Sequence, residues 1–293
     1  MKTQPGQPRT LVVIPAYNEA GRIGAVLNAI RHLREDTLVI DDGSEDDTAN
    51  IASRLGFNVH SLPVNSGLTA IYSAAEELGK SWNYSHILSM DADGQHDPGY
   101  IPAFLDAFEH YDLVSGCRFY HPEEIPAPKI ASNLFAIMLF REVLQKSLPD
   151  VACGFRGWKI GTISLAPETN PGEVTPSRFG IVYSMMIRHI LAGKEAGFVR
   201  IPAIYHPGDP LNTKIPEIIS LLTVMLRYKK QGDSLQAALD LVRDKRNFSL
   251  YLSGYRFEAK RVTDNAYLFE TDHDRAIGYF RNVHELKEYE HKS

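Results

Sequence analysis

The sequence predicts an α/β fold: a mostly parallel β-sheet with helices on both faces, followed by a small C-terminal extension. Through the first 120 residues, apolar runs of four to six residues alternate with segments of helical periodicity. The runs are almost entirely apolar, which indicates strands that are buried on both faces of the sheet. Most of the runs are followed by Pro, Gly or Asp, the residues typical of loops.

The first part of the chain supplies five predicted strands, residues 11–14, 37–40, 57–62, 86–90 and 113–116. Apolar residues between these strands recur at helical spacing, which predicts helices over residues 23–33, 47–55, 68–82 and 101–110. Asp46 or Asp47 is placed to cap the second of these helices.

The rhythm changes after Arg118, where a loop rich in Pro and Glu is predicted over residues 120–128. Beyond it the sequence predicts helices over residues 129–148, 177–192 and 214–230, and extended chain over residues 151–160 and 198–205. The last sixty residues predict one helix, strand-like alternation over residues 248–269 and a charged tail. We therefore predict a main domain over residues 1–230 and an extension of unknown role over residues 231–293.

Composition narrows the range of functions. Hydrophobic residues make up 44% of the chain and charged residues 23%, the balance of an ordinary globular protein. The formal net charge of −5 gives no basic surplus for phosphate contacts, so we expect no nucleic-acid partner. Cys117 and Cys153 are too few for a disulfide framework and suit a reducing compartment. No apolar run approaches the roughly 20 residues of a membrane span, and no signal peptide is evident, so we expect a cytoplasmic protein.

Polar residues gather where three predicted strands end. Pro-Ala-Tyr-Asn-Glu occupies positions 15–19, Asp-Asp-Gly-Ser positions 41–44, and Asp-Ala-Asp-Gly-Gln positions 91–95. In an open parallel sheet, ligands bind outside the carboxyl ends of the strands. Carboxylates alone repel phosphate, whereas a divalent cation between them satisfies both anions. The pattern predicts a metal-bridged diphosphate site, with ordinary turn chemistry as the alternative for Asp-Asp-Gly-Ser.

Spacing excludes three other kinds of site. A dinucleotide site needs a glycine fingerprint after the first strand, where this chain has none. A P-loop needs a Gly-Lys-Ser/Thr ending, which is absent. A calcium loop that begins at Asp91 needs glycine at its sixth position and glutamate at its twelfth, but here Gly94 is fourth and Pro102 is twelfth.

Taken in order, these motifs resemble those of family 2 inverting glycosyltransferases with the GT-A fold, which contains a Rossmann-like nucleotide-binding half. The matching segments are residues 11–19, 39–44, 90–93 and 115–119. Within that family, the dolichyl- or polyprenyl-phosphate mannose or glucose synthases are the most similar group. Residues 150–156 also resemble the acidic-to-Gly-Phe-Arg segment of that group, and the resemblance covers roughly residues 9–228. It implies that residues 1–230 are a GT-A glycosyltransferase domain.

The resemblance implies a role for each matching residue. The base and ribose of a GDP- or UDP-hexose would lie against Pro15, Tyr17, Glu19, Val39 and Asp41. The diphosphate would lie along Asp91, Ala92 and Asp93, and the ligands of Mg²⁺ or Mn²⁺ would be Asp91, Asp93 and Gln95. Arg118 would bind a phosphate of the donor or of the acceptor, and Lys214 would close over the donor diphosphate.

The acceptor implied by the resemblance is a polyprenyl phosphate. Such a phosphate is already an anionic nucleophile, so it needs orientation and electrostatic stabilisation rather than a strong base. The first alternative is a hydroxyl of a saccharide or small molecule, which requires a carboxylate base, and Asp150 is the candidate. Two departures from the group concern the acceptor: Lys129 stands near the place of an expected arginine, and the expected arginine before Lys214 is missing.

Two functions of a different class also fit parts of the sequence. A non-catalytic scaffold that binds nucleotide sugars is one, although the intact acidic motif and Arg118 argue against it. A nucleotidyltransferase is disfavoured because its Gly-rich, basic first loop is absent. The apolar helix after Lys129 and the helix over residues 214–230 suit core packing, an oligomer face or a lipid interface, and the last would place the protein on the cytoplasmic face of a membrane. His96 is expected just outside the metal ligands.

Overall fold

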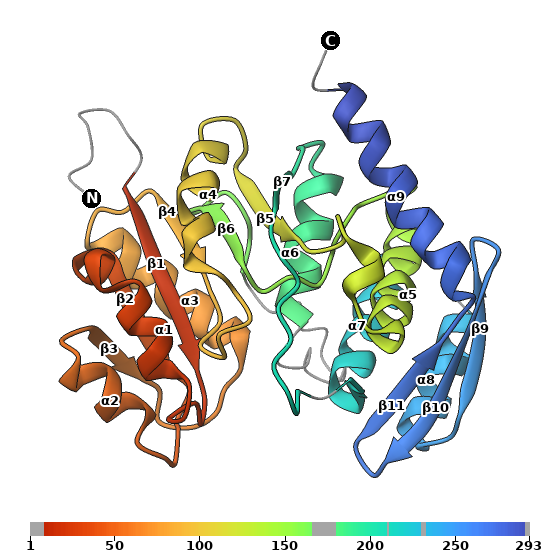
Figure 1. Ribbon diagram of the computed structural model, residues 1–293, viewed down its shortest axis with the longest axis horizontal. Helices are drawn as coiled ribbons and strands as arrows, with labels where there is room; N and C mark the ends of the chain where they lie inside the picture. The colour runs from red at the N-terminus through yellow and green to blue at the C-terminus, as the bar shows by residue number, and fades with distance from the viewer. Residues whose placement is uncertain (1–8, 166–179, 210, 230–232, 291–293) are drawn as a thin grey trace. The chain divides into compact units, whose positions relative to one another are not determined.

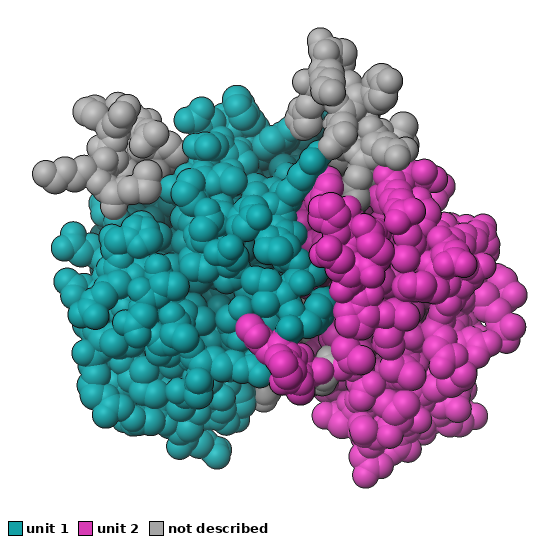
Figure 2. Space-filling view, viewed as in Figure 1, with its two compact units in different colours: residues 1–116, 153–167, 188–205 teal, residues 117–152, 168–187, 206–293 magenta. Residues whose placement is uncertain are grey.

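The computed structural model describes residues 9–165, 180–209, 211–229 and 233–290, with side chains described as far as residue 283. These residues form two compact units, which Figure 2 colours separately. Unit 1 comprises the described residues of 1–116, 153–167 and 188–205, and unit 2 comprises those of 117–152, 168–187 and 206–293. Each unit therefore combines segments that are distant in the sequence.

Two sequence predictions fall on residues outside this description. The first is the start of a predicted helix at residues 177–179. The second is the predicted domain boundary after residue 230. The division of the chain at residue 230 stays a prediction.

Unit 1 is built on a seven-stranded sheet of order β3-β2-β1-β4-β6-β5-β7 (Figure 1). Its strands are β1 (Thr10–Ala16), β2 (Thr37–Asp41), β3 (Asn58–Ser61), β4 (His86–Ser89), β5 (Leu113–Cys117), β6 (Arg156–Lys159) and β7 (Gly197–Arg200). β1 pairs in parallel with β2 and β4, and β2 pairs in parallel with β3. β6 runs antiparallel to both β4 and β5. The predicted α/β fold with a mostly parallel sheet is confirmed, while the direction of β6 was not predicted.

Helices connect the parallel strands, as the alternating pattern predicts. They are α1 (Ile23–Ala29), the 3-10 helix η1 (Arg31–Asp36), α2 (Thr48–Arg54), α3 (Leu68–Ser81), the 3-10 helix η2 (Pro98–Tyr100) and α4 (Ile101–Ala107). The helix predicted over residues 23–33 is divided into α1 and η1 at Ile30, and both Ile30 and Leu33 are buried. Asp46 accepts a hydrogen bond at Oδ1 from the Thr48 N–H at 3.0 Å, where α2 begins.

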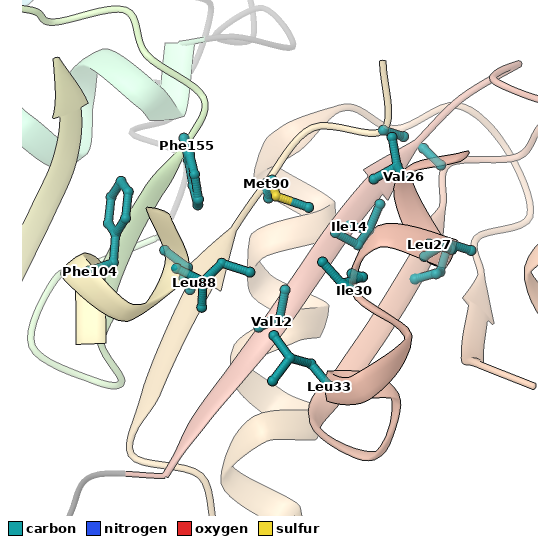
Figure 3. Close-up of a cluster of buried hydrophobic side chains, with 14 of the residues drawn as sticks. Val12, Ile14, Val26, Leu27, Ile30, Leu33, Leu88, Met90, Phe104 and Phe155 are labelled. Atoms are coloured by element: carbon teal, nitrogen blue, oxygen red, sulfur yellow. The ribbon is translucent and has the colours of Figure 1, made fainter. Parts of the chain in front are cut away.

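The core of unit 1 lies between the sheet and these helices. Figure 3 shows Ile14 of β1 beside Leu27 of α1 and Ile30, the residue that follows α1, and all three side chains are completely buried. Burial of each such aliphatic side chain stabilises the fold by roughly 1.5–3 kcal/mol. This packing holds β1 rigidly against its neighbours, and so it determines where the loops at the carboxyl ends of the strands lie.

Unit 2 combines helices with an antiparallel sheet of order β8-β11-β10-β9 (Figure 1). The strands are β8 (Thr213–Lys214), β9 (Phe248–Leu252), β10 (Tyr255–Thr263) and β11 (Ala266–Glu270). The helices are the 3-10 helix η3 (Pro122–Glu124), α5 (Ala127–Leu144), α7 (Ile215–Tyr228), α8 (Asp233–Arg243) and α9 (His273–Glu290), while α6 (Gly180–Leu191) contributes residues to both units. Helix α5 packs against β9, β11, α7 and α9.

An aromatic cluster joins α5 to the C-terminal sheet. The ring centroid of Phe135 on α5 lies 5.0 Å from that of Phe269 and 5.4 Å from that of Phe257. Residues 130–131 and 134–140 of α5 are all buried, and α7 buries most of its apolar residues as well. Of the three roles that the sequence left open for these two helices, namely core packing, an oligomer face and a lipid interface, their burial supports core packing. In the described part of the chain, no helix has both the length and the apolar character to cross a bilayer.

The sequence predicts a charged tail after residue 269, without assigning it a secondary structure, and helix α9 occupies this part of the chain. Ala276, Tyr279, Phe280 and Val283 are buried. Their spacing of three, four and seven residues places them on one face of a helix, so a few apolar residues suffice to anchor a charged segment. Phe280 stacks on Phe119 with ring centroids 4.4 Å apart.

Candidate active site

The carboxyl ends of β1, β2 and β4 are neighbours, because the three strands are parallel and adjacent in the sheet. The loops that follow them, residues 17–19, 42–44 and 91–95, therefore meet at one edge of unit 1, as the sequence predicts.

Hydrogen bonds tie the loop after β1 to the loop after β2. The Asn18 N–H donates to Ser44 Oγ at 2.9 Å, and the Glu45 N–H donates back to Asn18 Oδ1 at 2.9 Å. The Glu19 N–H donates to Thr48 Oγ1 at 2.8 Å. These bonds hold the Glu19 main chain against the start of α2, and they leave its carboxylate available.

Exposure separates the residues that the resemblance assigns to the nucleotide. Tyr17 is 41% exposed, and Pro15 is partly buried. Asp41 is buried, and its Oδ1 accepts a hydrogen bond from the Ser44 N–H at 3.2 Å. Val39 is completely buried in the hydrophobic core, so its side chain has no access to a ligand.

The second aspartate of Asp-Asp-Gly-Ser has a structural role. The buried Asp42 carboxylate accepts hydrogen bonds from the Ser66 N–H at 2.7 Å and from the Gly67 N–H at 2.8 Å, just before α3. Gly43 has φ of +71°, and a Cβ there would lie 2.8 Å from the carbonyl carbon of Val64. This half of the motif is therefore turn chemistry, the alternative that the sequence left open.

Three carboxylates interact at the edge after β1 and β4, and we call them the acidic cluster: Glu19, Asp91 and Asp93. Burial raises the pKa of Glu19, and the negative charges of Asp93 and Asp91 add to the increase. Burial also raises the pKa of Asp93, with the charge of Asp91 as the next cause. Arg22 opposes both increases in pKa. Partly buried carboxylates whose pKa is raised by burial and by neighbouring negative charge favour the binding of a cation.

The loop that carries Asp91 and Asp93 is closed by its own hydrogen bonds. The Asp91 N–H donates to His96 Nδ1 at 3.1 Å, and the Gln95 N–H donates to Asp93 Oδ1 at 2.9 Å. His96 is buried and stacks on Phe155 with ring centroids 5.2 Å apart. The ring therefore fixes the main chain of Asp91, whose side chain is 40% exposed.

Sequence reasoning missed the contact between Gly154 and Asp91. A Cβ at Gly154 would lie 2.8 Å from Asp91 Oδ1 and closer still to Oδ2, so only glycine leaves room for this carboxylate. The sequence signal was the glycine of the Gly-Phe-Arg segment, which does not reveal its packing partner. Ala92, beside Asp91, is buried.

The acidic loop provides oxygen ligands of the kind that Mg²⁺ and Mn²⁺ prefer, namely the two carboxylates of Asp91 and Asp93 and the amide oxygen of Gln95. Among the residues that the structure describes, no group of three or more His, Cys, Asp or Glu is arranged to hold a metal ion. Mg²⁺ in nucleotide sites commonly uses one or two carboxylates together with substrate phosphates. The residues present fit such an ion.

Unit 2 holds the predicted phosphate-binding arginine. Arg118 forms a two-pronged ion pair with Asp150, with Nε 2.8 Å from Oδ2 and Nη2 3.0 Å from Oδ1. Asp150 is completely buried, and its Oδ1 also accepts a hydrogen bond from the Ala152 N–H at 3.1 Å. Both carboxylate oxygens of Asp150 are therefore engaged in orienting Arg118.

Lys129 and Lys214 belong to the same unit and share one electrostatic environment. Burial lowers the pKa of Lys129, while the nearby charge of Glu217 raises it and those of Arg118 and Lys214 lower it. Burial raises the pKa of Glu217, and Lys214 and Lys129 oppose that increase. We call Arg118, Lys129 and Lys214 the basic cluster. The sequence-predicted residues thus fall into two groups, an acidic one in unit 1 and a basic one in unit 2.

Comparison with known proteins gives concordant results. The family model of glycosyl transferase family 2 matches residues 11–161. Polyprenol monophosphomannose synthase of Mycolicibacterium smegmatis is 32% identical over 163 residues, 52% of this chain and 62% of that protein. Undecaprenyl-phosphate mannosyltransferase of Micrococcus luteus is 30% identical over 212 residues, 67% of this chain and 83% of that protein. The chain therefore spans less than two thirds of the first relative.

Among solved structures, glucosyl-3-phosphoglycerate synthase of Mycobacterium tuberculosis, in complex with Mn²⁺, UDP and glucosyl-3-phosphoglycerate, superimposes with a TM-score of 0.54. The match covers 92% of this chain and 88% of that one, at 18% sequence identity. A likeness at this identity concerns the fold alone, and the fold is that of the GT-A glycosyltransferases.

Proposed function

The chain belongs to glycosyl transferase family 2, and from this we propose that it is a metal-dependent enzyme that transfers a hexose from a nucleotide-diphosphate sugar to a polyprenyl phosphate. The names of the two relatives support this reaction, since one is a polyprenol monophosphomannose synthase and the other an undecaprenyl-phosphate mannosyltransferase. A lipid acceptor would bring the enzyme to a membrane surface, on its cytoplasmic face.

The observation that carries the proposal is the acidic cluster. Asp91, Asp93 and Gln95 would hold Mg²⁺ or Mn²⁺, and the partial burial that raises the pKa of Asp93 makes an uncompensated charge there unfavourable. When bound, the cation would offset the negative charge that develops on the departing nucleoside diphosphate. Tyr17 and the neighbouring Asp41 would contact the base and ribose.

The basic cluster would bind phosphate. Asp150 holds the Arg118 guanidinium in one orientation through hydrogen bonds from Nε and Nη2, and its positive charge would attract phosphate oxygens. Lys129 adds a point charge, and Lys214 would bind the donor diphosphate. A phosphate acceptor needs no general base. The engagement of both Asp150 oxygens therefore supports a phosphate acceptor over a hydroxyl acceptor.

Product formation tests the proposal. The full chain is incubated with Mn²⁺, a GDP- or UDP-hexose labelled in the sugar, and a polyprenyl phosphate. We expect labelled product in the organic phase and a loss of about 100-fold or more in Asp93→Asn, as typically follows removal of a transition-state electrostatic contact. Asp106→Asn, an exposed change on α4, is the matched control and should retain full activity. Unchanged activity in Asp93→Asn, or label only in the aqueous phase, would contradict the proposal.

A further inference from the structure

Lys214 is part of the C-terminal sheet. Strand β8 consists of Thr213 and Lys214 alone, and it pairs antiparallel with β11, Lys214 opposite Ala266 and Thr213 opposite Tyr267. The pairing is extended by a hydrogen bond from the Ile215 N–H to the Asn265 carbonyl oxygen at 3.0 Å. Lys214 is also the residue that immediately precedes α7. Its main chain is therefore held by a strand that lies in the predicted extension.

Strand β11 is itself firmly anchored. Tyr267 is completely buried, and its hydroxyl donates a hydrogen bond to the Arg246 carbonyl oxygen at 2.6 Å. Phe269, two residues further on, is buried against Phe135 of α5. Burial of these side chains and the hydrogen bond of Tyr267 stabilise the position of β11. Strand β11 therefore holds the main chain of Lys214 in place through the strand pairing.

The packing of α5 on the C-terminal sheet also positions Lys129, the second lysine of the basic cluster. Lys129 lies in the first turn of α5, and the aromatic contacts of Phe135 join that helix to the sheet. Lys129 and Lys214 each act on the pKa of Glu217, so the two ammonium groups lie near one carboxylate. Thus the C-terminal sheet contacts both elements that carry these lysines.

We infer that the C-terminal extension is a working part of the anion-binding site, in which β11 positions Lys214 and Ala266 borders its side chain. Directly opposite residues in an antiparallel pair project from the same face, with Cβ atoms about 4.5–5.5 Å apart. A side chain at position 266 therefore lies beside Lys214. The inference rests on the role of Lys214 in the proposed function.

A charge at position 266 tests this placement. Ala266→Glu puts a carboxylate opposite Lys214, and Ala266→Gln has nearly the same shape without the charge. With Mn²⁺ present, we expect the Kd of GDP or UDP, whichever the wild-type protein binds, to be about three- to tenfold higher in Ala266→Glu than in Ala266→Gln, as expected for a nearby pair of opposite charges. In a Lys214→Met background the difference between the two variants should be smaller, because only the direct repulsion between the introduced carboxylate and the diphosphate is left.

Two results separate the inference from the proposed function. If Lys214→Met weakens nucleotide binding while Ala266→Glu and Ala266→Gln bind alike, β11 does not border the site and the inference is overturned. If Lys214→Met binds as tightly as the wild-type protein, the assignment of Lys214 to the diphosphate fails instead. Because Ala266 is only 9% exposed, the larger side chains can impair folding. Asn265→Asp is then used, an isosteric change at an exposed turn that should weaken binding in the same direction.

Discussion

The hydrogen-bond partners and neighbouring charges of Asp42, Asp150 and Asp93 give these three aspartates different roles. Asp42 is saturated by two main-chain N–H groups, and Asp150 is saturated by Arg118 and a main-chain N–H. Asp93 accepts a hydrogen bond from the Gln95 N–H. Its pKa is nevertheless raised, first by burial and second by the negative charge of the neighbouring Asp91. Residue type alone does not distinguish these carboxylates, whereas their hydrogen-bond partners do.

At this scale, His96 should control metal affinity through the main chain of Asp91. His96→Phe keeps a ring to stack on Phe155 but removes the acceptor for the Asp91 N–H, whereas His96→Asn keeps an acceptor near the position of Nδ1. We expect Mn²⁺ affinity to fall about 10–100-fold in His96→Phe, the usual cost of losing such a contact, and less in His96→Asn. Titration of Mn²⁺ followed by electron paramagnetic resonance measures this. Equal affinities in the two variants would show that the hydrogen bond is unimportant.

His86 should make the fold sensitive to acid. Burial, together with the nearby charge of Lys159, lowers its pKa from 6.5 to about 4, and the ring stacks on Phe108. In the unfolded chain His86 binds a proton below about pH 6.5, whereas in the folded protein it does so only below about pH 4. The free energy of unfolding therefore decreases as the pH falls through this window. Between pH 8 and pH 5, we expect the wild-type protein to lose about 2 kcal/mol more than His86→Gln. Urea unfolding at both pH values measures the difference, and parallel losses would contradict it.

At the scale of elements, the loop before α3 is held by one side chain. Both oxygens of Asp42 bind main-chain N–H groups there, and the loop packs so closely on Gly43 that no Cβ fits. Strand β2 and helix α3 are thereby joined at the edge that carries the candidate nucleotide site.

Asp42→Ala should destabilise the protein by about 2–3 kcal/mol, because it removes hydrogen bonds to a charged group and leaves two N–H groups without that partner. Asp47→Ala is the comparison: Asp47 forms an exposed ion pair with Arg54, and such pairs contribute little to stability because solvent screens them. Denaturant titration of both variants checks the order, and an equal cost would refute the structural role of Asp42.

At the scale of the whole molecule, each compact unit is assembled from separate stretches of the chain. Residues 117–152 pack with residues beyond 206 in unit 2, and their shared core is the aromatic cluster around Phe135. The C-terminal residues thus complete a core that begins near the middle of the sequence.

Ligand binding should stabilise the whole chain only when metal is present. GDP or UDP at 100 times its Kd should add about 2.7 kcal/mol to the free energy of unfolding, a shift seen as a higher Tm. We expect EDTA to abolish this shift and Asp93→Asn to reduce it strongly, because the carboxylate would hold the cation that bridges to the diphosphate. A shift of equal size without metal would contradict the assigned role of the acidic cluster.

Much of the architecture of unit 1 is readable from local sequence. Strands β1 to β5 lie within two residues of their predicted bounds, because strand and helix periodicities depend on near neighbours. The meeting of the acidic loops followed as well, since carboxyl ends of adjacent parallel strands share an edge. The direction of β6 and the fit of Gly154 against Asp91 were beyond such reading. The helical spacing of the apolar residues in α9 is present in the sequence, but the helix was not predicted.

By itself, the sequence determined that the protein has a mostly parallel α/β core, that acidic loops end its strands, and that its motifs are those of a glycosyltransferase. The tertiary structure alone decided that Asp150 pairs with Arg118 and that Lys214 pairs with a strand fifty residues later. The reason is physical: periodicity reflects which face of an element is buried, whereas pairing and packing partners are chosen by contacts between segments far apart in the chain.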